Sequence, residues 1–366
     1  MSRSQNLRLL RLTKKTGKNY YYTIMPTTKK KVRFNGLIGQ EKAKRKLDFH
    51  LDNFDATNVL PHMLFIAPKG CGKTHFAKAV ARNLMSAEPT YRQTINEFGD
   101  RTITEVPAGQ APKRFLEVNC SSIRSVPQLV EGLLLEKVIN KEVTVLFDEA
   151  SELPKDVSMW LLSAINPNEN NFNSVDHQDM TLDFDFRRQT FMFATTEAHK
   201  LFHALVDRCD RVDLEEYTLD ELGKIVMLNL ENLKLKCDMT VLKEMSSILR
   251  GNARAAQKMA GNIKNYLARA KKKKFDRGDW LKLKHALGIM PLGLNDIECQ
   301  ILRALNERKE SSLTNLSAKI GLTPECIRRD FEMYLQKHNL IQISTGGRSL
   351  TKEGRDYLKE NLNTKA

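Results

Sequence analysis

The sequence lacks any apolar run of the roughly 18 residues that a membrane-spanning helix requires. Its first segment has no apolar core of the kind found in a secretory signal. The 6 cysteines are scattered, and no C-x-x-C pair suggests a zinc site or a redox motif. No internal repeat at solenoid periods is present. These absences exclude several classes of protein, and we expect a soluble, cytoplasmic protein with reduced thiols.

Acidic residues are missing from the beginning of the chain. No Asp or Glu precedes Glu41, whereas lysine and arginine recur there, and residues 1–33 are therefore expected to form a basic arm. Over the whole chain Lys and Arg outnumber Asp and Glu by 59 to 44, which gives a net charge of +15. This excess favours a polyanionic partner, nucleic acid first and an anionic membrane surface second. For the arm itself, a disordered solubilising tail is the alternative.

With 366 residues the chain is long enough for two or three domains. Apolar strands alternate with helical segments in the first half, which is typical of a parallel sheet in an α/β fold. The expected strands are residues 63–66, 114–119, 143–147 and 189–194. Residues 86–113 are rich in Pro, Gly and Thr and show no clear periodicity, so we expect most of this stretch to be an exposed insertion.

One stretch has the composition of a phosphate-binding loop. Between the expected strand 63–66 and a helix-like segment the chain reads Ala67-Pro68-Lys69-Gly70-Cys71-Gly72-Lys73-Thr74, followed by His75. Glycines let backbone N–H groups approach a phosphate, the lysine reaches the β and γ oxygens, and the threonine hydroxyl can hold Mg²⁺. Ala67 replaces the usual first glycine, which is tolerable if its φ is negative. We predict that residues 70–75 bind a polyphosphate with Mg²⁺.

Two adjacent carboxylates, Asp148 and Glu149, follow the expected buried strand 143–147. In open α/β sheets, ligands bind at the carboxyl ends of the strands. There Asp148 would hold the Mg²⁺ shell, and Glu149 would orient and deprotonate the attacking water. An acidic pair favoured by the dipole of the following helix is the alternative, but the upstream phosphate loop favours the catalytic interpretation.

Two further polar residues follow in the α/β region. Thr195 comes directly after strand 189–194, where its hydroxyl could hold the water or the γ-phosphate. Arg208 lies on an expected short helix, from which it could reach the nucleotide of a neighbouring subunit and neutralise charge in the transition state. For Arg208, a solvated surface arginine is the alternative.

The remainder of the chain is expected to form two smaller domains. Thr218 and Glu221 have the spacing of a capping box, which opens a helical domain over residues 218–290 and leaves residues 34–217 for the α/β domain. Residues 291–366 have three helical segments and a hairpin, the pattern of a winged helix. Basic residues that could contact DNA phosphates there are Arg328, Arg329, Arg348, Lys352 and Arg355. A protein-binding winged helix is the alternative.

Taken in order, these motifs resemble the AAA+ ATPases, and among them the RuvB family of Holliday-junction branch-migration motors, over about residues 34–357. The signature Arg250-Gly251-x-x-Arg254, at the start of an amphipathic helix, together with the winged helix points to RuvB. The resemblance implies ATP as the nucleotide. It also implies that Leu37 and Ile38 lie on the adenine side, Tyr217 near the nucleotide, Thr195 at the sensor-1 position, Arg208 as the arginine finger and Arg254 as the γ-phosphate sensor.

The same resemblance implies a ring oligomer, expected to be a hexamer, that acts as a DNA helicase and drives branch migration in recombination and repair. Residues 166–188 lie where the family projects a hairpin that docks on RuvA. A hairpin is expected here too, but its Asn-rich, acidic sequence differs from that of the family. The family has three arginines in the wing, and residues 343–348 of this chain retain only Arg348. Residues 115–120 resemble clamp-loader ATPases, so a clamp loader is one alternative function. An ATP-switched DNA-binding protein of the replication-initiator type is another.

Overall fold

The structure is a computed structural model, and it describes residues 33–95, 101–308 and 310–361. Nearly all of the expected basic arm, residues 1–32, lies outside the described part. The chain divides into two units, residues 1–37 and 38–366. In the described part of the first unit, the Leu37 N–H donates to the Phe34 carbonyl over 3.1 Å and closes a turn. Among the described residues, no helix is long and apolar enough to cross a membrane.

The second unit contains the predicted parallel sheet. Its strands are β1 (Met63–Ile66), β4 (Arg114–Asn119), β5 (Val143–Asp148), β8 (Gln189–Thr195) and β9 (Asp210–Asp213), in the spatial order β4-β5-β8-β1-β9. Every neighbouring pair is parallel. The four expected strands are confirmed. The short and mostly polar β9 has no apolar run that could have revealed it, and it forms one edge of the sheet.

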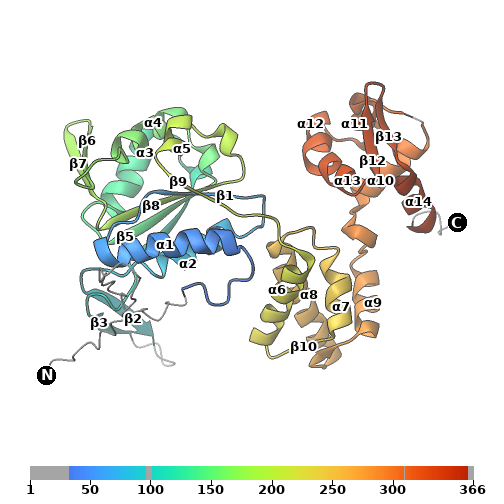
Figure 1. Cartoon of the computed structure of the whole chain (residues 1–366), viewed down its shortest axis with the longest axis horizontal. Coiled ribbons are helices and arrows are strands. Elements are labelled where there is room, and N and C mark those ends of the chain that lie inside the picture. Colours follow the sequence, from blue (N-terminus) through green and yellow to red (C-terminus); the bar gives the residue numbers. More distant parts are fainter. Residues whose placement is uncertain (1–32, 96–100, 309, 362–366) are drawn as a thin grey trace, which may run out of the picture. The chain divides into compact units, whose positions relative to one another are not determined.

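Helices cover both faces of the sheet (Figure 1). One face carries α1 (Glu41–Thr57) and α2 (Lys73–Ala81), and the other carries α3 (Val126–Leu129), α4 (Lys155–Ala164) and α5 (His203–Asp207). Successive side chains of a strand point to opposite faces. On β5, Val145 and Phe147 therefore both join the buried cluster with Leu161 of α4. α3 continues directly into a π-helical segment, Val130–Leu135.

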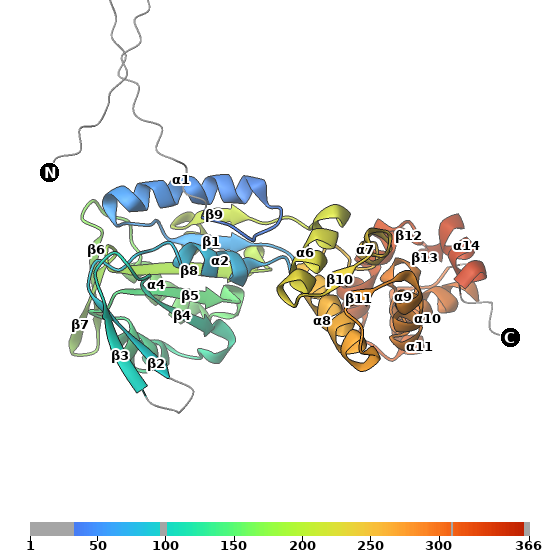
Figure 2. The ribbon, with the colours of Figure 1, turned by 90° about the horizontal axis from the view of Figure 1, so that it is seen from below.

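Two hairpins extend from the sheet. The β2–β3 hairpin (Thr90–Ile95 and Arg101–Val106) ends just before β4, and the β6–β7 hairpin (Phe172–His177 and Met180–Asp185) ends just before β8. Both therefore join the amino ends of their strands, and Figure 2 shows them at the same end of the sheet. The hairpin expected within residues 166–188 is confirmed. The regular hairpin within the insertion 86–113 was not foreseen, because residues 101–105 are exposed on both faces and show no apolar alternation.

A helical domain follows the sheet. It comprises α6 (Leu219–Asn232), α7 (Met239–Ser246), α8 (Ala253–Ala270) and α9 (Arg277–Ala286), with a small two-stranded pairing of β10 (Lys236–Cys237) and β11 (Lys274–Phe275). The predicted capping box is present: Thr218 accepts from the Glu221 N–H, and the Glu221 carboxylate accepts from the Thr218 N–H. At the start of α8 the Asn252 side chain accepts from the Ala255 N–H over 3.1 Å. Both caps fix the points at which these helices begin.

The C-terminal region has the predicted winged-helix pattern. Its helices are α10 (Asp296–Asn306), α11 (Leu313–Ile320), α12 (Pro324–Cys326), which continues through a π-helical segment (Ile327–Glu332) into α13 (Met333–Lys337), and α14 (Lys352–Asn361). The hairpin pairs β12 (Ile341–Ser344) with β13 (Gly347–Leu350). The helix α14 was not expected. Its Tyr357 and Leu358 complete the buried cluster of this region, which explains why the chain continues as a helix beyond the wing.

Candidate functional site

The phosphate-binding loop has the backbone that its glycines predict. It connects β1 to α2, and Gly70 and Gly72 have φ values of 83° and 95°, in the left-handed region that favours glycine. Ala67, which replaces the usual first glycine, keeps a negative φ. Because α2 begins at Lys73, the free N–H groups of its first turn face the loop. The loop and the helix together form the anion-binding arrangement expected from the sequence.

Lys73 is held over this loop rather than in solvent. Its side chain is buried, with the residue only 9% exposed, and Nζ donates to the Ala67 carbonyl over 3.0 Å. Burial lowers the pKa of Lys73, and the nearby Asp148 carboxylate partly offsets that effect. A polyphosphate in the loop would supply the negative charge that this desolvated ammonium group lacks.

Thr74 and Asp148 meet at the predicted metal position. The Thr74 hydroxyl donates to Asp148 Oδ2 over 2.8 Å, which joins the first turn of α2 to the carboxyl end of β5. Hydroxyl and carboxylate oxygens are the hard ligands that Mg²⁺ prefers. The donor set therefore fits the predicted ion.

Glu149 follows in a backbone conformation that is uncommon for its residue type. Its φ is 56°, in the left-handed region, and its N–H donates to Asp148 Oδ1 over 3.0 Å. This conformation costs energy for a residue with a Cβ, and such residues concentrate at functional sites. The Glu149 residue is exposed, next to a carboxylate that is fixed by Thr74. Glu149 therefore lies exposed at the carboxyl ends of the parallel strands.

The hydroxyl groups at the end of β8 have different environments. Thr195 is fully buried, and its Oγ1 accepts from the Glu197 N–H over 3.0 Å. Thr196 is exposed. Register places Ala194 beside Asp148, so both threonines follow the strand at the edge where the phosphate loop lies. This geometry favours Thr196 over the predicted Thr195 as the hydroxyl that reaches a phosphate or water.

Arg208 lies near the amino ends of the parallel strands, whereas the phosphate loop lies at their carboxyl ends. It follows α5 by one residue and precedes β9, whose first residue Asp210 is in register with Met63 at the amino end of β1. The phosphate loop begins beyond the carboxyl end of β1, four residues or about 13 Å further along. The guanidinium donates to the Ala204 carbonyl and to Asn166 Oδ1, each over 3.1 Å. This placement favours action on another subunit's nucleotide over action on its own.

Tyr217, Ile38 and Leu37, which were predicted to lie near the nucleotide, have different surroundings. Tyr217 is buried, which raises its pKa to about 12, and a Cβ on Gly72 would lie 3.3 Å from its hydroxyl. Tyr217 therefore borders the loop. Ile38 is half-buried, and two residues later Gln40 donates to the Glu215 carbonyl over 2.7 Å and accepts from its N–H. Leu37 is half-buried in the short first unit.

The first turn of α8 and the residue that caps it contact the phosphate loop directly. Asn252 Nδ2 donates to the Lys69 carbonyl over 3.1 Å, and the Arg254 N–H donates to the Gly70 carbonyl over 3.3 Å. A Cβ on Gly70 would lie 2.1 Å from Asn252 Oδ1. The contact with the helical domain, here called the lid, therefore also requires glycine at position 70. Cys71 is buried against Gly251, and burial raises its thiol pKa to about 11. The sequence analysis named Arg254 but missed Asn252, whose only signal is its capping position.

The predicted DNA-contact residues differ in how they are paired. Arg328 and Lys352 are exposed, and the Arg328 guanidinium lies 3.9 Å from the Glu325 carboxylate. Arg329 forms an ion pair with Glu197 at 3.2 Å. Arg348, in contrast, donates from Nε and Nη2 to both carboxylate oxygens of Glu332 over 2.7 and 3.2 Å. Its side chain is only 16% exposed, so the wing arginine is already engaged within the domain.

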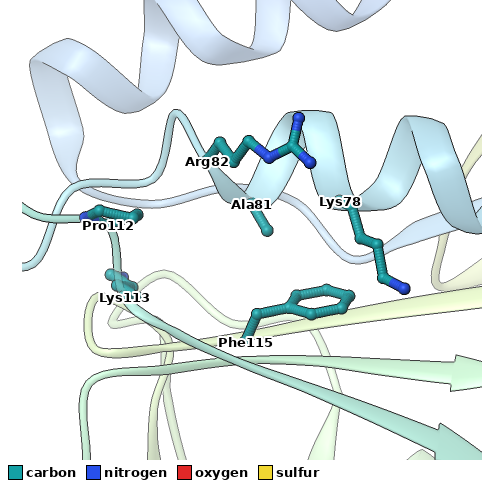
Figure 3. A pocket seen from close by; sticks show the side chains of 6 residues that line it. All are labelled: Lys78, Ala81, Arg82, Pro112, Lys113 and Phe115. Atoms are coloured by element: carbon teal, nitrogen blue, oxygen red, sulfur yellow. The ribbon is translucent and has the colours of Figure 1, made fainter. Parts of the chain in front are cut away.

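A pocket of about 240 Å³ lies beside the C-terminal half of α2. Its lining is basic and partly aromatic (Figure 3): Lys78, Ala81, Arg82, Pro112, Lys113 and Phe115. Lys78 forms an ion pair with Glu117 there. None of these lining residues belongs to the predicted phosphate site, which uses the other end of the same helix. His75, predicted with the loop, is exposed on the first turn of α2.

Comparison with known families shows which proteins the two parts of the chain resemble. Residues 63–217 match the model of the AAA family, described as ATPases associated with various cellular activities. Residues 291–359 match the model of the RuvB C-terminal winged-helix domain. The chain is therefore similar to RuvB proteins, whose winged-helix domain it contains. Its first part is thus an AAA ATPase domain with a nucleotide site.

Individual RuvB relatives match nearly the whole chain. The Holliday junction branch migration complex subunit RuvB of Mesomycoplasma hyopneumoniae is 24% identical over 342 residues, which cover 89% of this chain and 95% of the relative. The RuvB of Kosmotoga olearia is 25% identical over 332 residues, 89% and 88% of the two chains. The solved RuvB branch migration motor of Thermotoga maritima has a TM-score of 0.66 at 21% identity and covers 88% and 95%, which shows the shared fold.

Proposed function

We propose that this protein is an ATP-driven DNA motor that moves the branch point of Holliday junctions during recombination and repair. One observation carries the proposal: Thr74, Asp148 and Glu149 converge beside a phosphate loop that the lid segment also contacts, in a chain with a RuvB winged helix. The named relatives are branch migration subunits, which agrees with this function.

The proposed chemistry is hydrolysis of ATP, with Thr74 and Asp148 holding Mg²⁺. The ion would neutralise charge on the β and γ oxygens. Lys73 would leave the Ala67 carbonyl and donate to the same phosphates. Glu149 would accept a proton from the attacking water, and Thr196, rather than the buried Thr195, would position that water or the γ-phosphate. On the lid, Arg254 would sense whether the γ-phosphate is present.

A ring assembly completes the proposed site. Because Arg208 lies at the amino edge of the sheet, its guanidinium would stabilise the transition state in a neighbouring subunit. We propose a homo-hexamer in the cytoplasm that acts on duplex or junction DNA as a helicase. Its exposed Arg328 and Lys352 would contact phosphates. The β6–β7 hairpin within residues 166–188 would be the docking element for a RuvA-like partner.

The decisive experiment is ATP-dependent dissociation of a synthetic four-way DNA junction by the full chain. Wild-type protein should separate the junction, and Glu149→Gln and Arg208→Ala should each abolish this activity. If wild-type protein hydrolyses ATP but leaves the junction intact at low salt, with and without a RuvA-type protein, the motor proposal is wrong. A clamp loader would then be recognised by stimulation with a sliding clamp, and an initiator switch by slow hydrolysis that DNA does not change.

A further inference from the structure

Arg250 lies in the segment that joins α7 to α8, and its side chain contacts residues outside the helical domain. Its backbone is left-handed, with a φ of 54°. From there Nε donates to the Gly293 carbonyl over 3.1 Å, and Nη1 donates to Glu298 Oε1 over 2.9 Å. Nη2 bonds to both partners as well. The guanidinium also lies over the Tyr334 ring, 3.9 Å from its centroid. One side chain of the helical domain thus has three partners beyond that domain.

Glu298 also accepts a hydrogen bond within the winged helix itself. It is 0% exposed and completes the capping box of α10, where its Oε2 accepts from the Asn295 N–H over 2.8 Å. A buried carboxylate without its cation is strongly disfavoured. Separation of the two domains at this point would leave the Glu298 carboxylate without the guanidinium that neutralises it. The planar, forked guanidinium fits a carboxylate and an aromatic face together, which a lysine cannot do.

The connector between the two domains is held at the same place. The Tyr334 hydroxyl donates to the Leu292 carbonyl over 2.7 Å, and the Tyr357 hydroxyl donates to the Pro291 carbonyl over 2.9 Å. Gly293 packs so closely on the segment after α7 that a Cβ would lie 2.5 Å from the Ile248 carbonyl oxygen. All three connector residues are therefore fixed, and the connector is not a free hinge.

A second ion pair near this junction, Lys337 with Glu216, is of a different kind. Its side chains are 57% and 45% exposed, so water and salt screen the attraction. The Arg250 cluster is largely dehydrated, with side-chain exposures of 26% for Arg250 and 0% for Glu298. The buried cluster is therefore the contact able to hold the winged helix to the helical domain under load.

We propose that Arg250 is a positioning residue that locks the winged helix to the lid, so that the two domains move as one body. The segment that contains it contacts the phosphate loop through Asn252 and Arg254, and the winged helix through Arg250. When the γ-phosphate is lost and the lid rotates, the winged helix therefore rotates with the lid. This inference rests on the proposed motor function for its purpose, but the locking itself is independent of it.

The test compares Arg250→Lys and Glu298→Gln with the matched control Arg269→Lys, an exposed arginine on α8. Each full-length protein is spin-labelled through non-canonical amino acids at the exposed positions 265 and 359, on α8 and α14. The distribution of distances between the labels is measured with ADP and with a non-hydrolysable ATP analogue. ATPase rate and junction dissociation are measured on the same proteins without labels.

We expect one narrow distance distribution in wild type and control, the same with either nucleotide, and a clearly broader one in both variants. Junction dissociation per ATP hydrolysed should fall about tenfold in the variants, while the ATPase rate stays within about threefold of wild type. Distributions as narrow in both variants as in wild type would overturn the proposal. If wild-type protein moves no junction, the motor function fails, and the distances still decide whether Arg250 locks the domains.

Discussion

The Thr74 hydroxyl donates a hydrogen bond of 2.8 Å to Asp148 Oδ2. These residues are 74 positions apart, and they come from the helix after the phosphate loop and from the interior strand β5. The bond brings both oxygen ligands predicted for Mg²⁺ to one point before any ion is bound. A site organised in this way requires little rearrangement when the metal and nucleotide arrive.

The Thr74 hydroxyl should be necessary for hydrolysis. Thr74→Ala removes one oxygen ligand and the hydrogen bond that fixes Asp148, so the ATPase rate should fall by about 100-fold or more at millimolar Mg²⁺. Thr74→Ser keeps the hydroxyl and should retain most of the rate. Steady-state ATPase assays over a Mg²⁺ titration provide the measurement. Full activity of the alanine variant would remove Thr74 from the metal site.

Arg208 should act across a subunit boundary. Arg208→Ala leaves its own phosphate site intact, whereas Glu149→Gln leaves its own arginine intact. Each protein alone should hydrolyse ATP about 1,000-fold more slowly than wild type. An equal mixture should recover activity, because some interfaces pair an intact site with an intact arginine.

The control for this mixing experiment is Arg211→Ala, which removes a nearby exposed arginine that is bonded to Asp213. It should keep near wild-type activity alone. A mixture of Arg208→Ala and Glu149→Gln that stays as inactive as its components would contradict action in trans.

Lys113 should make stability depend on pH in the alkaline range. It is 3% exposed, and burial lowers its pKa from 10.5 to about 8, although Glu142 opposes the shift. Between these values the unfolded chain holds a proton that the folded chain has lost. The free energy of unfolding therefore gains up to about 3 kcal/mol from this site as pH rises from 8 to 10.5.

Lys113→Met, which has no such proton, serves as the comparison. It should be more stable than wild type at pH 7, and this advantage should shrink as the pH approaches 10. Urea denaturation at a series of pH values measures the difference, with the exposed Lys258→Met as control. A constant difference between Lys113→Met and wild type across this range would show that Lys113 titrates normally.

The wing arginine Arg348 should stabilise its domain more than it binds DNA. Arg348→Ala would leave the Glu332 carboxylate, 2% exposed, without its partner, at a cost of about 3 kcal/mol in unfolding free energy. Arg328→Ala, at an exposed position, should change stability by less than about 0.5 kcal/mol. It should instead weaken DNA binding and reduce the salt slope by about one. Chemical denaturation and DNA titrations at several salt concentrations separate the two roles, and equal stability of the two variants would refute this assignment.

The sequence could predict whatever depends on local chemistry. The phosphate loop, the carboxylates after β5 and the capping box at Thr218 each lie within a few residues, and their residue types dictate their conformation. Arg254 at the start of α8 was found in the same way. The hairpin β6–β7 could be expected because residues 182–186 alternate between apolar and acidic side chains.

What the sequence could not predict depends on side chains that meet across the fold. Nothing near Arg250 or Glu298 indicates that they pair, since 48 positions separate them. Thr195 and Thr196 are adjacent and identical, and only the packing of β8 determines which hydroxyl is buried. In the β2–β3 hairpin, residues 101–105 are exposed on both faces, and the periodicity that reveals strands arises only from burial.

The contacts of Asn252 and Arg254 with the carbonyls of Lys69 and Gly70 have a kinetic consequence. They join the start of the helical domain to the backbone of the phosphate loop itself. A rotation of the helical domain should therefore disturb the same backbone that would hold the phosphates. We expect nucleotide exchange to be coupled to movement of this domain.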